Sequence, residues 1–422
     1  MNERAVLGTT DILLPDFSRV DGTRWAVIAC DQFTSEPEYW ESAAKLVGNA
    51  PSTLRLMLPE VYLSEGEKRI EQINAEMSRA LREVLIPHPN AMVGLLRTQS
   101  DGKLRRGIIG AVDLEHYDYK KDSKSLIRAT EGTILERIPP RVAIRRNAPL
   151  ELPHVILFID DPEQTVIEPA LSSSCDREPL YDFDLMLGGG HVCSYLLNDR
   201  EKEAVQSALA ELITPETMKR HYGDATLAPM LFAVGDGNHS LASAKAFYEE
   251  IKEKLGVDAA KDHPARYALV EVVNLRDAVL EFEPIYRAVF DCSPDELLRE
   301  LGAFAASLCG TAAPQTITCI TATEESTLTV ERPTQHLTVG TLQSFLDDYL
   351  SRHPEATIDY IHGEDSTRAL AKKPNTVCFL FEGMHKDEFF SSVMQDGALP
   401  RKTFSMSRAR DKRYYLECRK IQ

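Results

Sequence analysis

The sequence contains little that would place the chain in a membrane or outside the cell. No apolar run approaches the roughly 18 consecutive apolar residues that a membrane-spanning helix needs, and the N-terminal sequence MNERA begins no apolar signal segment. The 8 cysteines are scattered, without a CxxC pair or a ligand-like cluster. A large chain of this kind keeps its cysteines reduced. We therefore expect a cytoplasmic protein with no membrane partner, whose cysteines are small apolar core residues.

Basic residues are also scarce. The chain has 48 lysines and arginines against 65 aspartates and glutamates, a formal net charge of −17. Such a charge repels polyanions at long range, so we expect no nucleic-acid partner. A local basic pocket for a single phosphate can still exist inside an acidic protein. The sequence therefore predicts a small-molecule partner and gives no indication of the oligomeric state.

The length and the periodicity predict a mixed architecture. A chain of 422 residues, 43% of them hydrophobic, is long enough for two or three packed units. Helical spacing of apolar residues occurs at 67–85, 200–213, 241–255, 294–308 and 342–350. Strand-like runs occur at 25–30, 93–97, 108–112, 155–159, 230–234, 268–273, 358–361 and 377–381. The threonine-rich stretch 311–338 alternates as half-buried strands do. We predict an α+β (mixed α/β) fold with units at 1–280 and 281–422, the second being the smaller.

The most informative polar motif joins a predicted buried strand to a predicted helix. It reads Gly235-Asp236-Gly237-Asn238-His239-Ser240. The glycines permit positive φ angles and close backbone approach, and the N-terminus of the following helix favours an anion. An ordinary turn with Asp or Asn as the N-cap would need no function. Four hydrogen-bonding side chains are more than a cap needs, so we interpret the motif as a binding or catalytic site.

Two further motifs leave alternatives open. The run Gly188-Gly189-Gly190 before His191 is, on spacing alone, a plain hairpin loop. Arginines between positions 128 and 146 could hold a phosphate through forked hydrogen bonds or form a solvated charged face. They are Arg128, Arg137, Arg141, Arg145 and Arg146. The Walker pattern GxxxxGK[ST] is absent from the sequence.

Six stretches of the chain carry a family resemblance. They are ACDQFTSEPEYW (29–40), PSTLRLMLPEVYL (51–63), SLIRATEGTILERIPPRVAIRRNAPLELPH (125–154), VGDGNHSLASAK (234–245), PNTVCFLFEGMHKDEFF (374–390) and LPRKTFSMSRARDKRYYLECRKI (399–421). Together they resemble the bacterial and archaeal domain-of-unknown-function family 1015 over essentially the whole chain. That family is in turn similar to the ParB/sulfiredoxin-like superfamily, which includes free-serine kinases. The resemblance implies a ParB/sulfiredoxin-like catalytic core with additional β-rich N-terminal and smaller C-terminal parts.

The resemblance also implies a set of site residues. Related proteins carry Asp-Gly-His-His-Arg where this chain has residues 236–240, so Asp236 and His239 match, whereas Asn238 and Ser240 do not. Three further residues of this chain resemble family residues. Glu131 matches a glutamate near Arg128, His191 matches a histidine before the signature, and Lys402 matches a lysine near the C-terminus. The implied catalytic residues are Glu131, His191, Asp236 and His239. The implied substrate and phosphate ligands are Arg128, Gly235, Gly237, Asn238, Ser240, Arg401, Lys402 and Thr403. Arg401 or the 137–146 arginines would replace the missing signature arginine.

The function implied by this resemblance is phosphoryl transfer on a small hydroxylated metabolite. The expected substrates are serine or phosphoserine and a nucleotide (ATP, ADP or AMP). The enzyme would act as a serine kinase, catalyse the reverse reaction, or hydrolyse phosphoserine as a phosphatase. Such chemistry needs a base, cations and a divalent metal. We assign Glu131 as the base and Asp236 as the Mg²⁺ ligand or alternate base, and expect the basic tail to return to the site. The alternative function is a non-catalytic nucleotide-binding regulator or scaffold.

Overall fold

The protein consists of two compact units. The computed structural model describes residues 5–153, 155–406 and 408–422. The first unit comprises Met1–Ala129, Thr133–Leu280 and Ser407–Gln422, and the second comprises Thr130–Gly132 and Glu281–Met406. Both units mix helices and strands, so the predicted α+β (mixed α/β) class is confirmed. Among the described residues, no helix is long and apolar enough to cross a membrane.

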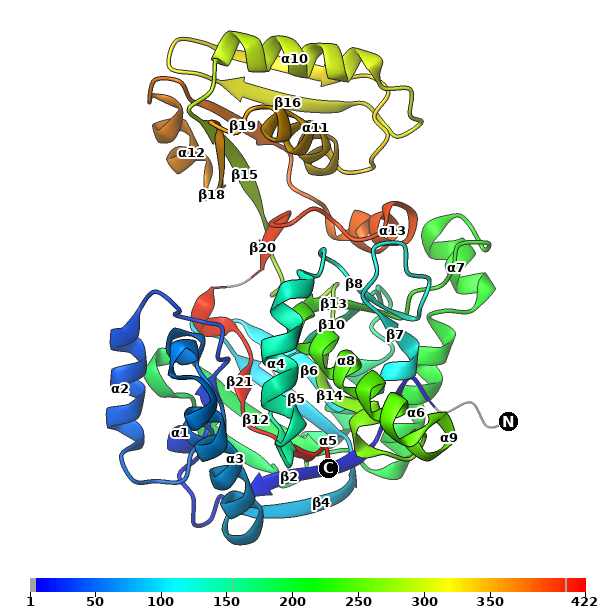
Figure 1. The fold of residues 1–422 in the computed structure, drawn as a ribbon. Helices are drawn as coiled ribbons and strands as arrows, with labels where there is room; N and C mark the ends of the chain where they lie inside the picture. Colours follow the sequence, from blue (N-terminus) through cyan, green and yellow to red (C-terminus); the bar gives the residue numbers. More distant parts are fainter. Residues whose placement is uncertain (1–4, 154, 407) are drawn as a thin grey trace. The chain divides into compact units, whose positions relative to one another are not determined.

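The first unit is built on a mixed 10-stranded sheet (Figure 1). Its strand order is β11 (Tyr181–Asp184), β12 (His191–Leu196), β5 (Val93–Thr98), β6 (Leu104–Asp113), β14 (Tyr267–Asn274), β10 (Ile156–Ile159), β13 (Phe232–Asp236), β8 (Ile127–Ala129) and β7 (Tyr117–Asp118), with β1 (Leu7–Gly8) on β6. The strand-like runs predicted at 93–97 and 108–112 form the antiparallel pair β5–β6. The pairs β10–β14, β8–β13 and β7–β8 are parallel.

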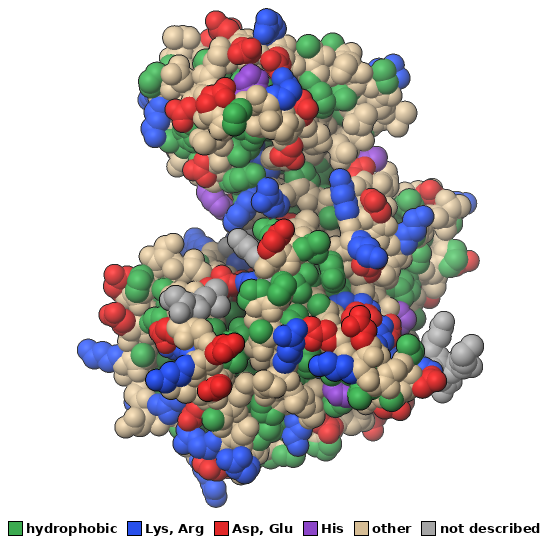
Figure 2. Space-filling view, viewed as in Figure 1, with side chains coloured by type: hydrophobic (Ala, Val, Ile, Leu, Met, Phe, Trp, Pro, Cys, Tyr) green, Lys and Arg blue, Asp and Glu red, His purple; other side chains and the backbone are tan. Residues whose placement is uncertain are grey.

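Helices cover the sheet of the first unit. They are α1 (Gly22–Trp25), α2 (Pro37–Val47), α3 (Gly66–Glu83), α4 (Ile138–Arg146), α5 (Ile167–Ser174), α6 (Asp199–Glu211), α7 (Pro215–Tyr222), α8 (Asn238–Leu255) and α9 (Val257–Ala260). Successive strand residues pack into different cores: Ile109 and Leu269 into one, Ile108 and Val270 into the other. This is the period of two expected for a sheet buried on both faces. On the face of this unit seen in Figure 2, acidic and basic side chains are interspersed.

The C-terminal residues belong to the first unit. Strand β21 (Tyr414–Tyr415) pairs with β3 (Val27–Ile28), and β22 (Arg419–Lys420) pairs with β9 (Leu150–Glu151). A further antiparallel pair joins β2 (Thr10–Pro15) to β4 (Leu85–Ala91). The sequence-based boundaries placed 281–422 in one unit, whereas residues 407–422 cluster with the first. Strands of two residues carry too short a pattern to reveal such a return from sequence.

The second unit has its own sheet and core. The strand order is β17 (Glu325–Val330), β16 (Gln315–Ile320), β19 (Val377–Phe381), β15 (Phe282–Phe290) and β18 (Thr357–His362), with β20 (Phe404–Met406) on β15. The helices are α10 (Pro294–Ser307), α11 (Thr338–Arg352), α12 (Glu364–Ala371) and α13 (Lys386–Asp396). The threonine-rich stretch forms the antiparallel pair β16–β17, as its alternation predicts.

Candidate functional site

The motif at 235–240 forms a one-residue turn between β13 and α8. Gly237 has φ 83° and ψ 28°, a left-handed conformation that side chains other than glycine adopt at a cost. A Cβ at Gly237 would lie 3.0 Å from Cγ2 of Val155, and a Cβ at Gly235 would lie 2.5 Å from Cε2 of Phe158. Both glycines are therefore required by close contacts, and the predicted strand, turn and helix are confirmed.

The positive end of α8 faces one carboxylate and one ammonium group. Oδ1 of Asp236 accepts the Gly237 N–H at 2.9 Å, and Oδ2 lies 3.2 Å from Nζ of Lys412. Gly237 offers no side-chain acceptor as the N-cap, and the first turn of α8 contains no acidic residue. A helix start with its dipole and backbone N–H groups, next to a lysine, is an electrostatically favourable place for an anion.

His239 connects the helix start to the segment after β8. Its Nε2 accepts the Ile134 N–H at 3.3 Å, so a neutral ring in this arrangement carries its proton on Nδ1. Its carbonyl oxygen accepts the Ser243 hydroxyl at 2.6 Å. Beside these residues, Oδ1 of Asn238 and Oγ1 of Thr133 are buried without a hydrogen-bond partner in the described part of the chain. Buried polar atoms of this kind are typical of sites that receive a polar ligand.

Several residues of the predicted site lie in the second unit. Glu131 forms a backbone bridge with Leu399. Desolvation lowers the pKa of the buried Arg287 to about 10, and the charge of Glu131 acts in the opposite direction. The guanidinium of Arg287 donates to the backbone oxygens of Arg401 at 3.0 Å and Lys402 at 2.8 Å. The hydroxyl of Thr403 donates to the carbonyl of Pro400. The basic tail residue at the turn is Lys412 of the first unit, and not Arg401 or Lys402. Lys412 was not predicted from the sequence.

His191 has carboxylate partners of its own. Its Nδ1 lies 2.8 Å from Oδ1 of Asp184, and its Nε2 lies 2.6 Å from Oδ1 of Asp182. Desolvation lowers the pKa of His191, but the two carboxylates outweigh it and the net pKa is raised. Strand β12, which carries His191, is separated from β13 by β5, β6, β14 and β10 in the sheet order. The sheet order therefore does not bring His191 next to the turn.

The arginines between 128 and 146 are engaged by the protein itself. Arg128 is buried and donates to the backbone oxygens of Ser125, Ala228 and Pro229, and desolvation lowers its pKa to about 10. The arginines of α4 pair with carboxylates: Arg141 with Glu60, Arg145 with Glu151 and Arg146 with Glu250. The side chain of Arg137 lies outside the described residues. The guanidinium of Arg128 thus donates to three backbone oxygens, whereas the sequence predicted that it would bind a phosphate.

A family comparison decides the assignment of the chain. The sequence model of a family described as protein of unknown function (DUF1015) matches residues 16–349. The chain belongs to the DUF1015 family. A comparison with curated proteins gives no match.

Solved structures show only distant likeness to this DUF1015 protein. A conserved hypothetical protein from Pyrococcus furiosus is 15% identical, with a TM-score of 0.30 over 50% of this chain and 87% of that chain. A C-terminally truncated SbnI from Staphylococcus aureus is 12% identical, with a TM-score of 0.34 over 71% and 82%. A mutant free serine kinase in complex with ADP is 15% identical, with a TM-score of 0.30 over 51% and 86%. At these TM-scores the similarity carries no argument about function.

The turn of the DUF1015 protein does not have the donor set of a protein-held metal. Within the described ranges, no group of three or more His, Cys, Asp or Glu side chains could hold a metal ion. The carboxylate of Asp236 is already paired with the ammonium of Lys412. Lys412 therefore places a positive charge next to Asp236, the residue that was expected to bind Mg²⁺.

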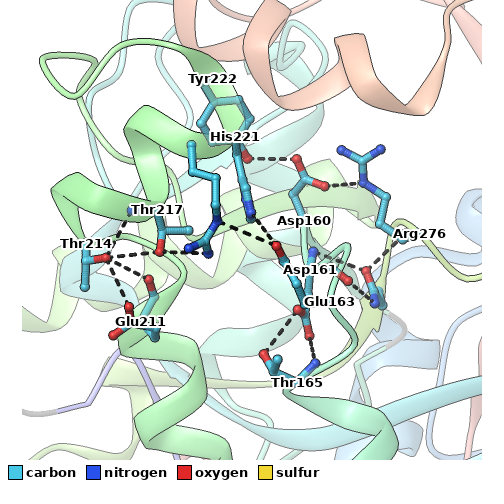
Figure 3. A network of polar contacts seen from close by, with 12 residues as sticks. Asp160, Asp161, Glu163, Thr165, Glu211, Thr214, Thr217, His221, Tyr222 and Arg276 are labelled. Atoms are coloured by element: carbon cyan, nitrogen blue, oxygen red, sulfur yellow. Dashed lines mark hydrogen bonds and ion pairs between the residues drawn. The ribbon is translucent and has the colours of Figure 1, made fainter.

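Figure 3 shows a second polar cluster. It follows β10, which runs antiparallel to β13, so it lies at the other end of these two strands from the 235–240 turn. Asp160 follows the end of β10 and accepts from Tyr222 at 2.8 Å and from Arg276 at 2.5 Å. Glu163 lies 3.2 Å from Nε2 of His221. Desolvation raises the pKa of Tyr222, and the charge of Asp160 raises it further. The strand at 155–159 was predicted from the sequence, but the partners that α7 supplies to this cluster were not.

Proposed function

We propose that the turn at 235–240 binds the phosphate of a nucleotide and that the protein transfers a phosphoryl group between that nucleotide and a small hydroxylated metabolite. Serine or phosphoserine is the proposed metabolite, on the basis of the family resemblance. The observation that carries the proposal is the start of the 18-residue helix α8, whose N-cap is a glycine without a side-chain acceptor, beside Lys412. This combination favours the charge that accumulates on transferring phosphoryl oxygens.

Each group at the turn has a proposed role. The N-terminal N–H groups of α8 and the ammonium of Lys412 hold phosphate oxygens, and Asp236 fixes the position of that ammonium group. In the kinase direction, the serine hydroxyl oxygen forms a bond to phosphorus, the bond from phosphorus to the nucleotide oxygen breaks, and a carboxylate takes the hydroxyl proton. Glu131 is the proposed base on the resemblance alone, with Asp236 as the alternate. His239 donates from Nδ1 to a phosphate oxygen.

Substrate interconversion tests the proposal. The protein is incubated with ATP, ADP or AMP and with serine or phosphoserine, and the products are separated. We expect exchange between at least one pair. The His239→Ala variant should lose ~10² to 10³ in kcat, because a preorganised donor is removed. A lowered thermal midpoint with near-normal exchange would instead make His239 a structural residue, whose loss costs about 1 kcal/mol as for a helix cap.

The second candidate function is a nucleotide-binding regulator without turnover. It is favoured by Ser240, which stands where related signatures carry arginine. Loss of an arginine from a phosphate site removes forked hydrogen bonds that stabilise transferred charge. Tight ADP binding with no interconversion of any substrate pair would favour the regulator over the enzyme.

A further inference from the structure

A cavity of about 140 Å³, partly open to solvent, lies in the first unit next to the start of α8. Helices α4 and α8, which lie side by side in Figure 1, form part of its walls. Ser240 and Leu241, from the first turn of α8, line the cavity. Val155, which packs against Gly237, also lines it. The cavity is therefore within one helical turn of the proposed phosphate position.

Pockets of this size are uncommon in a close-packed protein. Native cores contain few voids larger than one water molecule, because an unfilled space forfeits packing contacts and lowers stability. The volume is close to that of an engineered cavity of about 150 Å³ that stays dry and binds benzene. A space of these dimensions next to the proposed phosphate site fits a small flat ring system.

The walls define what kind of ring would bind. Most are apolar, including Leu56, Met57, Leu58, Met77, Ile144 and Leu150. Arg145 also lines the cavity; its Nη2 donates to Oε2 of Glu151 at 2.6 Å. Its Nε is buried and has no hydrogen-bond partner among the residues that the structure describes. An apolar ring bearing a nitrogen or oxygen acceptor would bury its faces on these walls and accept from Nε.

We infer that this cavity receives the heteroaromatic base of the nucleotide whose phosphate the 235–240 turn binds. The inference rests on the proposed function for the phosphate end of the ligand. It adds that recognition of the base is mainly by apolar packing, with one hydrogen bond from Arg145. A ligand with phosphate but no base would use the turn alone.

Cavity-filling variants test this assignment. Ala148, just after α4, and Ala244, in α8, line the cavity and are each 2% exposed. The substitutions Ala148→Leu and Ala244→Leu would therefore place a larger side chain in the cavity. Binding of ADP, pyrophosphate and benzimidazole is measured by calorimetry, and folding by the thermal midpoint. For the wild type we expect ADP to bind at least ~10-fold more tightly than pyrophosphate, because the base buries apolar surface. In the filled variants the two affinities should become about equal, and benzimidazole binding should disappear.

The Arg145→Lys variant keeps the charge beside Glu151 but removes Nε. Its affinity for ADP should be about 2- to 10-fold lower, as expected for one lost hydrogen bond, and its affinity for pyrophosphate should be unchanged. Folded Leu variants that keep the wild-type ratio of ADP to pyrophosphate affinity, together with wild-type benzimidazole binding, would overturn the inference. Wild-type protein that binds ADP and pyrophosphate with equal affinity would overturn the inference and leave the proposed phosphate site standing. Wild-type protein that binds neither would contradict the proposed function itself.

Discussion

At the scale of single residues, the proposed phosphate turn depends on the missing side chain of Gly237. Gly223, the C-cap of α7, has a similar positive φ of 75° but nothing within 4 Å of its would-be Cβ. The loss of stability in Gly223→Ala therefore measures only the cost of placing a side chain on a left-handed backbone. Gly237→Ala adds a contact with Val155 to that strain.

We expect Gly223→Ala to lower the free energy of unfolding by about 1 kcal/mol, and Gly237→Ala by roughly 2 to 4 kcal/mol. Urea denaturation of the two variants measures both values. Equal losses would mean that Val155 moves aside without cost and that the turn has room for a side chain.

Lys412 is the residue whose charge the proposed site needs most. Lys412→Gln should weaken pyrophosphate binding by roughly 10- to 100-fold, since a hydrogen bond to a charged group contributes about 1.5 to 3 kcal/mol. The matched control is Lys420→Gln in the same tail, where the side chain is exposed. Isothermal calorimetry compares the two variants. A loss of affinity shared equally by both would indicate general electrostatic attraction instead of a contact at the turn.

At the scale of secondary-structure elements, the local pattern predicts most of what carries the turn. The apolar run at 230–234 and the helical spacing at 241–255 correspond to β13 and α8. The turn between them was identified because glycines and polar side chains are adjacent in sequence. Lys412 could not be found in this way, since its pairing with Asp236 joins residues far apart in the chain. The arginines of α4 could not be interpreted either, because their carboxylate partners lie on other elements.

The tail is held to the sheet by buried charges. Arg413 donates to Oε2 of Glu271 at 3.1 Å and to Glu417. Arg105 donates to Oε1 of the same Glu271 at 3.0 Å. All of these side chains are buried. Removing one partner of a buried ion pair leaves an uncompensated charge, which costs more than the pair contributes.

Arg413→Met should therefore lower the free energy of unfolding by about 3 to 5 kcal/mol. The double variant Arg413→Met/Glu417→Leu removes one charge of each sign. Its free energy of unfolding should therefore fall by less than that of the single variant. Chemical denaturation of both proteins gives the comparison. A double variant that is the less stable of the two would show that packing, and not uncompensated charge, dominates at this position.

At the scale of the whole molecule, the main segment of the second unit, residues 281–406, is an insertion into the first unit. Its first strand pairs with its last: Phe282 in β15 is the register partner of Met406 in β20. The chain thus enters and leaves the second unit at neighbouring positions. Insertions with adjacent ends leave the host domain largely undisturbed.

Residues 281–406 expressed alone should fold into an α+β domain with cooperative two-state unfolding. The remaining chain, with Leu280 joined to residue 408 by a short Gly-Ser linker, should keep the thermal stability and the pyrophosphate affinity of the first unit. Circular dichroism and calorimetry test the two halves separately. A gradual, non-cooperative melt of the isolated 281–406 segment would contradict the insertion.

The pairing of β21 with β3 has a consequence for synthesis. Domains usually fold in the order in which the ribosome delivers them. Here Val27 and Ile28 have no strand partner until Tyr414 and Tyr415 have been synthesised, after the whole of residues 29–413. At about 5 to 20 residues per second, that wait is roughly 20 to 80 s. Residues 281–406 are synthesised before β21, so the nascent N-terminal part must keep its apolar surface from aggregating until β21 has been made.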